Sequence, residues 1–178
     1  MDKRIFVYGG NLGKPQDIPF IIECLKAEKD NEKVFFLIIG DGTEFNKLEQ
    51  YSFDSSQTNF KLLKRLPIDE FDRVIASCDV GFIFLNHRFT IPNFPSRLLS
   101  YMQNGLPVLA CTDASTDVGK AIVEGGFGWW CESKNVDSFK KVVEQATIFS
   151  KSVSFTKNEI NYLVNHYSVE SLYKMILY

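Results

Sequence analysis

The residues best suited to chemistry in this 178-residue chain lie in two short segments, and both could hold an anion. The first is the glycine-rich run at 9–13, which is followed by Lys14. Glycines let the backbone pass close to a ligand, and a lysine ammonium group can neutralise a phosphate as a point charge. A tight strand-to-helix turn with a solvated Lys14 would use the same residues. The run matches neither the G-x-G-x-x-G fingerprint nor the G-x-x-x-x-G-K-[ST] loop, which disfavours a Rossmann dehydrogenase and a P-loop nucleotidase.

The second segment is Pro95-Ser96-Arg97, where we expect a helix to begin directly after a long loop. The first N–H groups of a helix have no partner inside it, and the helix dipole places partial positive charge there. The N–H groups of Ser96 and Arg97, together with the Arg97 guanidinium, would therefore form an anion site. The structural alternative is an ordinary helix start with Arg97 lying along the surface.

The other titratable residues form no diagnostic constellation. His87 stands alone in the loop before Pro95, and the carboxylates of Asp113, Asp117 and Glu124 have no paired spacing. Gly40-Asp41-Gly42 predicts a sharp turn in which Asp41 accepts local hydrogen bonds. The four cysteines form no C-x-x-C pair and the chain has two histidines, so we expect reduced, buried thiols and no zinc site. No other metal or cofactor is expected.

The composition is that of an ordinary globular protein, with 45% hydrophobic and 24% charged residues. The formal net charge is −2 and the pI is about 5.7, so the chain lacks the basic footprint of nucleic-acid binding. The longest apolar runs, 34–39 and 80–85, are too short to span a bilayer, and no signal-peptide pattern precedes them. We therefore expect a soluble, cytoplasmic protein.

Short apolar runs alternate with helix-length amphipathic stretches along the whole chain. Strands are expected at 5–8, 34–39, 60–63, 80–85, 107–111 and 127–131. Helices are expected at 16–29, 43–51 (with Thr43 as N-cap), 69–77, 96–103, 115–124, 135–150, 156–166 and 168–177. Continuous apolar strands that alternate with helices predict an α/β doubly wound, Rossmann-like domain with a six-stranded parallel sheet covered on both faces. Without a linker or repeat, residues 1–178 are expected to form one domain.

The order of five motifs is more specific than any one of them. They are V-Y-G-G-N-L-G-K-P-Q (7–16), F-F-L-I-I-G-D-G-T-E (35–44), I-A-S-C-D-V-G-F-I (75–83), F-P-S-R-L-L-S-Y-M-Q-N-G-L-P-V-L-A (94–110) and G-G-F-G-W (125–129). Together they resemble the C-terminal, donor-binding domain of GT-B retaining glycosyltransferases of the group 1 (family 4) type, in particular bacterial capsule, O-antigen and exopolysaccharide members. The resemblance runs from about residue 5 to the last expected helix.

This resemblance implies a nucleotide diphosphate-sugar as the ligand and assigns a role to each matching position. The glycine-rich loop would approach the diphosphate, the loop after the third strand would hold the base through backbone groups, and the helix start would cradle the distal phosphate. Lys14 and Arg97 would stabilise the charge on the departing diphosphate, without a metal or a protein nucleophile. The implied binding residues are Gly9, Gly10, Asn11, Gly13, Lys14, Arg65, Leu66, Pro95, Ser96, Arg97 and Ser100.

Two positions depart from the family pattern, which places glutamates eight residues apart. Pro92 stands where the family contacts the transferred sugar, and it cannot make that contact. Ser100 stands where a second glutamate binds the ribose hydroxyls, and a serine offers at most a weaker contact through one hydroxyl.

The resemblance also implies partners, because GT-B enzymes react in a cleft between two domains. The acceptor-binding N-terminal domain is absent from these residues, so we expect it on another part of the protein or on a partner chain. Through that half the protein could associate peripherally with the inner face of the plasma membrane. An apolar stripe of Ile160, Leu163, Val164 and Tyr167 would face the core or support a homodimer.

Of two alternatives to a glycosyltransferase donor domain, one remains open and the other is disfavoured. The loss of both glutamates is compatible with a degenerate, non-catalytic binding or scaffold subunit. A sugar-nucleotide epimerase on the same scaffold lacks the histidine and acid that it would need.

Overall fold

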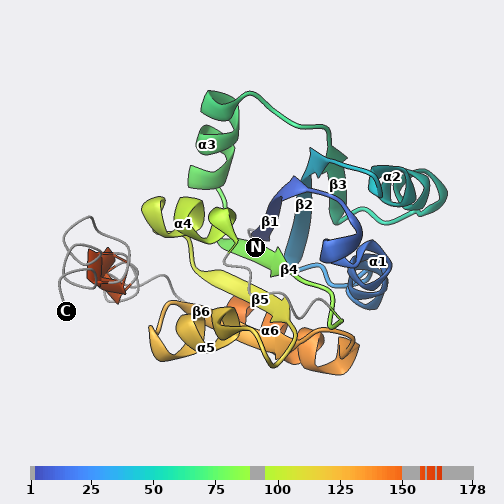
Figure 1. Cartoon of the computed structure of the whole chain (residues 1–178). Coiled ribbons are helices and arrows are strands. Elements are labelled where there is room, and N and C mark those ends of the chain that lie inside the picture. The colour runs from blue at the N-terminus through green and yellow to red at the C-terminus, as the bar shows by residue number, and fades with distance from the viewer. Residues whose placement is uncertain (1–2, 89–94, 150–156, 159, 163, 166–178) are drawn as a thin grey trace.

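The computed structural model describes residues 3–88, 95–149, 157–158, 160–162 and 164–165 (Figure 1). In this part of the chain, six parallel strands form one sheet in the order β3-β2-β1-β4-β5-β6. The strands are β1 (Arg4–Asn11), β2 (Val34–Asp41), β3 (Phe60–Leu63), β4 (Val80–Phe84), β5 (Val108–Thr112) and β6 (Gly128–Glu132). The predicted doubly wound α/β fold is confirmed.

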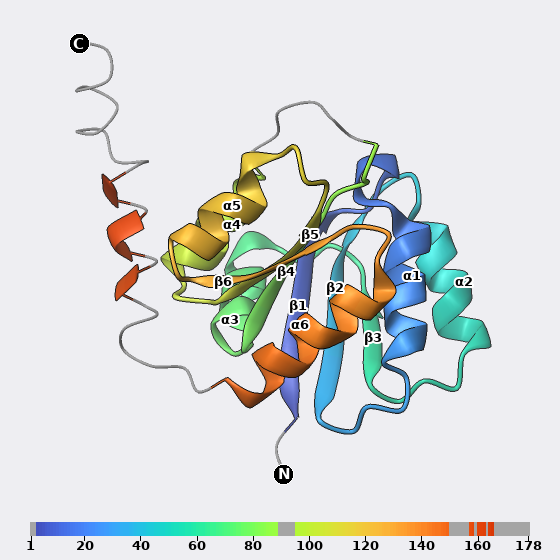
Figure 2. The same ribbon diagram turned by 90° about the horizontal axis from the view of Figure 1, so that it is seen from below.

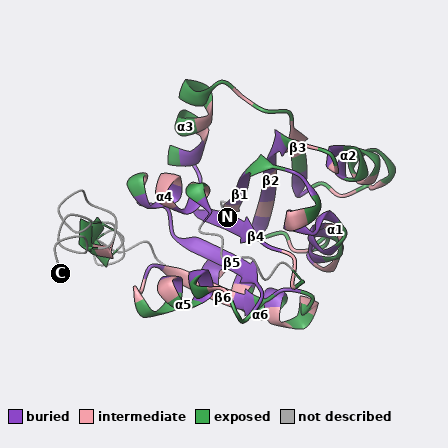
Figure 3. Ribbon diagram, in the orientation of Figure 1, coloured by how far each residue is buried: buried purple, intermediate pink, exposed green. Residues whose placement is uncertain are grey.

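Helices cover both faces of the sheet, and Figure 2 shows the two layers from below. Buried side chains of α1 (Ile18–Ala27), α2 (Phe45–Asp54) and α6 (Val136–Ile148) pack on one face. Those of α3 (Ile68–Ala76), α4 (Ser96–Gln103) and α5 (Asp117–Glu124) pack on the other. Burial of the central strands on both sides explains their uninterrupted apolar sequences, and Figure 3 shows these strands in the buried colour.

Phenylalanines fill the core between the sheet and the first helix layer. Phe82 of β4 lies at the centre of this cluster, with ring centroids 5.2 Å from Phe6 and 5.9 Å from both Phe36 and Phe139. Such aromatic pairs bury large apolar areas. All four cysteines are buried and free, as the sequence predicted.

Most elements begin and end close to the predicted residues, and the differences lie at their ends. The predicted N-cap Thr43 is wrong, because α2 begins at Phe45 and Glu44 occupies the N-cap position. The helix expected at 16–29 starts only at Ile18, after a separate 3₁₀ turn, η1 (Lys14–Gln16). Asp17 separates them because it adopts a left-handed conformation with φ of 52°, which a continuous helix does not allow.

The expected C-terminal helices fall largely on residues that the structure does not describe. The described residues within 157–165 are helical, whereas 168–177, Leu163 and Tyr167 lie outside the described part. Ile160 and Val164 are about half exposed. The ring of Tyr162 packs against Phe127, at a centroid distance of 5.1 Å.

Candidate functional site

The candidate site is an open pocket of ≈ 590 Å³ at the carboxyl ends of β1 and β2. The last residues of β1 and β2 and the loop after β3 form one side, and residues of α3 and α4 form the other. The pocket wall includes these predicted site residues: Gly9, Gly10, Asn11, Arg65, Leu66, Ser96, Arg97 and Ser100. Pro95 lines a smaller pocket that shares Ser96 and Arg97 with the first, whereas Gly13 and Lys14 line neither.

The two segments suited to anion binding meet at Arg97 and Gly10. The Arg97 guanidinium lies over the ring of Tyr8, 4.3 Å from its centroid. A Cβ on Gly10 would lie 2.9 Å from Arg97 Nη2, and Gly10 has φ of 134°, so this position favours glycine on both counts. Arg97 therefore crosses from the start of α4 to the end of β1.

One guanidinium nitrogen, Arg97 Nη1, is buried and has no hydrogen-bond partner among the described residues. Buried polar groups are nearly always paired, so an unpaired donor in a pocket marks a place for a ligand acceptor. Burial raises the pKa of the neighbouring Tyr8 hydroxyl, and the charge of Arg97 partly opposes that shift.

The start of α4 adds backbone donors beside Arg97. The helix begins at Ser96 with Pro95 as N-cap, and the Leu98 N–H donates to the Pro95 carbonyl at 2.9 Å. The N–H groups of Ser96 and Arg97 precede this first bond of the helix. Ser96 is exposed, so the helix terminus opens towards solvent and the pocket.

Three side chains that the sequence analysis did not single out shape the glycine-rich loop. Gln16 Oε1 accepts hydrogen bonds from the Gly13 N–H at 3.1 Å and from Asn11 Nδ2 at 3.2 Å. The Tyr8 hydroxyl donates to the Asn11 carbonyl at 2.6 Å. The fully buried Tyr101 hydroxyl accepts from the Gly9 N–H at 3.1 Å, which connects α4 to β1. The loop is thus held in place by the protein itself.

Lys14 and Asp41 take positions at the edge of this arrangement. Lys14 is exposed in the 3₁₀ turn and does not line the pocket, so its predicted contact with a phosphate stays a prediction. Asp41 lies on the pocket wall and its Oδ1 accepts from the Gly42 N–H at 2.8 Å, as expected for a turn.

A second polar cluster ties together the loops after β1, β4 and β6. The buried Asp17 Oδ2 lies 3.9 Å from Lys134 Nζ and 4.0 Å from His87 Nδ1. Asp17 and Lys134 are also the only non-glycine residues with positive φ in the described part of the chain.

Neither a metal centre nor a membrane span emerges from the described residues. They contain no group of three or more histidine, cysteine or acidic side chains that could hold a metal ion. None of their helices combines the length and apolar character that crossing a bilayer requires. The expectation of a metal-free site stays a prediction.

The strand order β3-β2-β1-β4-β5-β6 defines a Rossmann-like domain, in which ligands bind where the strand order reverses, between β1 and β4. Arg97 and the glycine-rich loop lie at this position. The chain belongs to the family described as "Glycosyl transferases group 1", whose profile matches residues 1–160. The family predicted from the five motifs is therefore confirmed.

Similar proteins agree with this assignment. The chain is 27% identical to the probable glycosyltransferase WbjE of Pseudomonas aeruginosa over 143 residues, which are 80% of this chain and 36% of WbjE. It is 23% identical to the putative colanic acid biosynthesis glycosyl transferase WcaI of Escherichia coli, over 84% of this chain and 37% of WcaI. The crystal structure of a mutant S. aureus TarM with fondaparinux, alpha-GlcNAc-glycerol and UDP superposes with a TM-score of 0.79, at 17% identity, over 98% of this chain and 35% of TarM.

The chain thus spans somewhat more than a third of the length of the curated relatives that it matches. Of the two positions where glutamates were expected, Ser100 lines the pocket and is half-buried. Pro92 lies outside the described residues.

Proposed function

We propose that this chain binds a nucleotide diphosphate-sugar and forms the donor-binding part of a glycosyltransferase. The observation that carries the proposal is the buried, unpaired Arg97 Nη1, held beside Gly10 at the start of α4. Charged acceptors such as phosphate oxygens pair strongly with a guanidinium, and helix N-termini favour them too. The UDP in the TarM complex supports a nucleotide diphosphate as the anion.

The residues that line the pocket favour one orientation of the nucleotide. The diphosphate would lie against Gly9, Gly10 and the N–H groups of Ser96 and Arg97. The base would lie towards Arg65 and Leu66, where the exposed Ile68 and the half-buried Phe71 offer apolar surface. The ribose would then come close to Ser100, one helical turn after Ser96.

This arrangement suits a reaction in which negative charge develops on a departing diphosphate. Arg97 and the helix N–H groups are fixed before the ligand arrives, so they stabilise that charge without reorganisation. Lys14 would add a second cation if the ligand reaches across the glycine-rich loop. With no protein nucleophile assigned, the bond between the sugar and the diphosphate would break, and the acceptor hydroxyl would attack the sugar on the face that the diphosphate leaves. The two ions would stay paired, and the diphosphate would take the proton of the acceptor hydroxyl.

Sugar transfer also needs an acceptor site, which we assign to an N-terminal domain or a partner chain. The relatives WbjE and WcaI are nearly three times as long as the segments that they share with this chain. The name of WcaI, a putative colanic acid biosynthesis glycosyl transferase, supports a role in bacterial polysaccharide biosynthesis. For the acceptor we propose a saccharide or a lipid-linked molecule. Peripheral attachment to the inner membrane face and homodimer formation stay predictions.

Ser100 favours a second candidate function, a degenerate domain that binds a partner without catalysis. It places one hydroxyl in the pocket where the family resemblance implies a carboxylate. The two candidates differ in whether the chain binds a nucleotide at all.

Calorimetric titration of the chain with UDP, GDP and their sugar conjugates tests the proposed function. Arg97→Ala should weaken binding by about 10- to 100-fold, because it removes a charged hydrogen-bond donor. Lys14→Ala should weaken it less, since Lys14 is outside the pocket wall. Arg73→Ala is the matched control, because Arg73 is exposed on α3 and does not line the pocket. The absence of binding at millimolar nucleotide would overturn the proposal and favour the scaffold function.

A further inference from the structure

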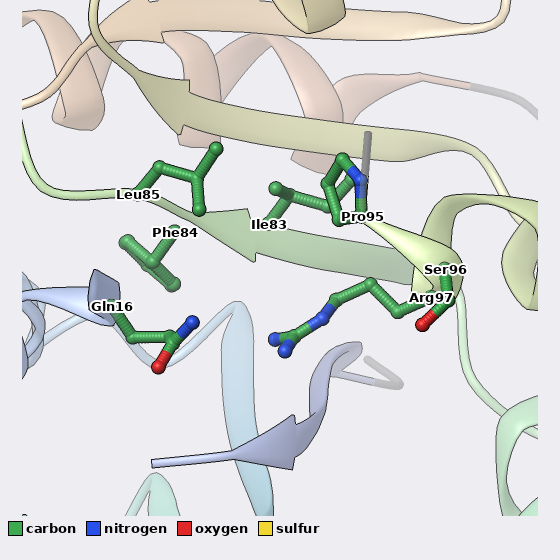
Figure 4. A pocket seen from close by; sticks show the side chains of 7 residues that line it. All are labelled: Gln16, Ile83, Phe84, Leu85, Pro95, Ser96 and Arg97. Carbon is green, nitrogen blue, oxygen red and sulfur yellow. The ribbon is translucent and has the colours of Figure 1, made fainter. Parts of the chain in front are cut away.

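A smaller pocket of ≈ 130 Å³ adjoins the nucleotide pocket and shares Ser96 and Arg97 with it (Figure 4). It lies over the carboxyl end of β4, and its wall includes Phe84 and Leu85. Figure 4 shows the side chains of Gln16 and Arg97 beside β4, pointing towards one another. Two polar side chains from distant parts of the chain thus line one pocket.

The orientation of the Gln16 amide follows from its hydrogen bonds. Two N–H donors, from Gly13 and Asn11, point at the same atom of Gln16, so that atom must be the carbonyl oxygen Oε1. The amide nitrogen Nε2 therefore points away from the loop. It donates no hydrogen bond to any of the residues that the structure describes.

Gln16 is also an unusual residue to find at this depth. Only 7% of its surface is exposed, and it is one of few buried polar residues in the described chain. The glycine-rich loop uses only the acceptor Oε1 of Gln16, because Asn11 and Gly13 donate both of the hydrogen bonds between the loop and this side chain. The two N–H groups of Nε2 remain available to an acceptor in the smaller pocket, whose wall includes Gln16.

The kind of acceptor follows from the position of the pocket, given the proposed function on which this inference rests. Arg97 and Ser96 border both pockets, so a diphosphate bound there has the nucleoside on one side. The group attached to its other end would enter the smaller pocket. In a nucleotide diphosphate-sugar that group is the sugar, whose hydroxyl oxygens accept hydrogen bonds from amide donors.

We propose that Gln16 is a specificity residue for the transferred sugar. Its Nε2 donates a hydrogen bond to a sugar hydroxyl in the smaller pocket, and its Oε1 holds the glycine-rich loop in place. One side chain thereby couples the conformation of the loop beside the diphosphate to recognition of the sugar.

Gln16→Met tests this assignment, since methionine fills a similar volume without the amide. The measured quantity is the ratio of the affinities for a nucleotide-sugar and for its nucleotide diphosphate. The probes are UDP-glucose, UDP-N-acetylglucosamine, GDP-mannose, UDP and GDP. A disturbed loop weakens the binding of both ligands, so its effect cancels in the ratio. Loss of the sugar contact weakens only the binding of the nucleotide-sugar, so it changes the ratio. The ratio should fall by about 3- to 10-fold, which corresponds to one hydrogen bond.

The matched control is Gln50→Met, because Gln50 is exposed on α2 and lines neither pocket of the site. It should leave the ratio unchanged. If Gln16→Met also leaves it unchanged while nucleotides still bind, the role of Gln16 is overturned and the proposed function stands. If the wild-type chain binds none of the probes, the proposed function fails instead.

A second measurement avoids any dependence on the folding of the methionine variant. In a ¹⁵N–¹H spectrum of the wild-type chain, Gln16→Glu identifies the side-chain amide signal of Gln16 by removing it. We expect the nucleotide-sugar to shift this signal beyond the shift that the diphosphate alone produces. Equal shifts with both ligands would overturn the sugar contact.

Discussion

Arg97 at the start of α4 stacks on Tyr8 of β1, with 4.3 Å between the guanidinium carbon and the ring centroid. The Tyr8 ring is completely buried, so this contact fixes the guanidinium in place. A planar guanidinium can lie on an aromatic face and still direct several N–H groups at an anion, which an ammonium group cannot do in the same way. The main cation of the pocket is therefore positioned before any ligand binds.

Arg97→Lys tests whether this geometry matters beyond the charge. Lysine keeps the positive charge but loses the planar fork and the stacking on Tyr8. We expect nucleotide diphosphate affinity to fall by about 3- to 10-fold by calorimetry, which is less than the loss in Arg97→Ala. Tyr8→Phe keeps the ring and should leave affinity within about twofold, although loss of the hydrogen bond to Asn11 should lower stability by about 1 kcal/mol. An Arg97→Lys variant with wild-type affinity would contradict a role for stacking.

The fold was predictable because burial dictates the sequence of each strand. Residues 80–84 are apolar without alternation, and both faces of this central strand are covered by helices. The ends of the elements were harder, because they depend on individual conformations. Asp17 is an example, since no pattern indicates that a residue just before a helix adopts a left-handed conformation.

The sequence predicted which two segments form the site, but not the side-chain contacts that hold these segments in place. Parallel strands bring their carboxyl ends to one edge, so the glycine-rich loop and the start of α4 were expected to meet there. The contacts of Gln16 and Tyr101 join loops and helices that no local pattern relates. For the same reason, the sequence alone could not distinguish the exposed Lys14 from Arg97, which reaches the pocket.

Ser100 offers a test of the ribose position. Ser100→Ala should weaken binding of UDP by about 2- to 10-fold if its hydroxyl contacts the ribose. Ser100→Glu should instead strengthen binding, because a carboxylate can accept hydrogen bonds from both ribose hydroxyls. The gain should disappear with 2′-deoxy-UDP, which lacks one of them. If Ser100→Glu strengthens the binding of UDP and of 2′-deoxy-UDP equally, the ribose does not lie at this position.

Gly40→Ala tests how closely the ends of β1 and β2 approach each other. A Cβ at Gly40 would lie 2.0 Å from the Gly10 carbonyl oxygen, and backbone cannot move aside as a flexible side chain can. We expect the free energy of unfolding to fall by about 1–3 kcal/mol in urea titrations. Gly13→Ala is the comparison, because its Cβ would meet the side-chain end of Asn11 at 2.9 Å. If Gly13→Ala lowers the free energy of unfolding as much as Gly40→Ala does, the close approach of Gly40 to the Gly10 backbone is not what destabilises the Gly40 variant.

The carboxyl group of Glu28, at the end of α1, should make the stability of the fold depend on pH. Its side chain is buried, and this burial raises the pKa of the carboxyl above 4.5, although the hydrogen bond from Asn31 Nδ2 at 2.6 Å opposes the shift. The folded state therefore binds the proton more tightly than the unfolded state does, so the ionised carboxylate costs stability at neutral pH. That cost is absent below the unfolded pKa and grows as the pH rises through the folded pKa.

Glu28→Gln removes this cost while its amide oxygen still accepts the bond from Asn31. We expect thermal unfolding to show a more stable variant at pH 7, and the gain should shrink as the pH falls and vanish below about 4.5. In an Asn31→Ala background the gain at pH 7 should be larger, because the ionised carboxylate then lacks its hydrogen-bond donor. A Glu28→Gln variant that is less stable than the wild type at pH 7 would show instead that the carboxylate contributes favourable interactions, among them its attraction to Lys140, that outweigh its burial.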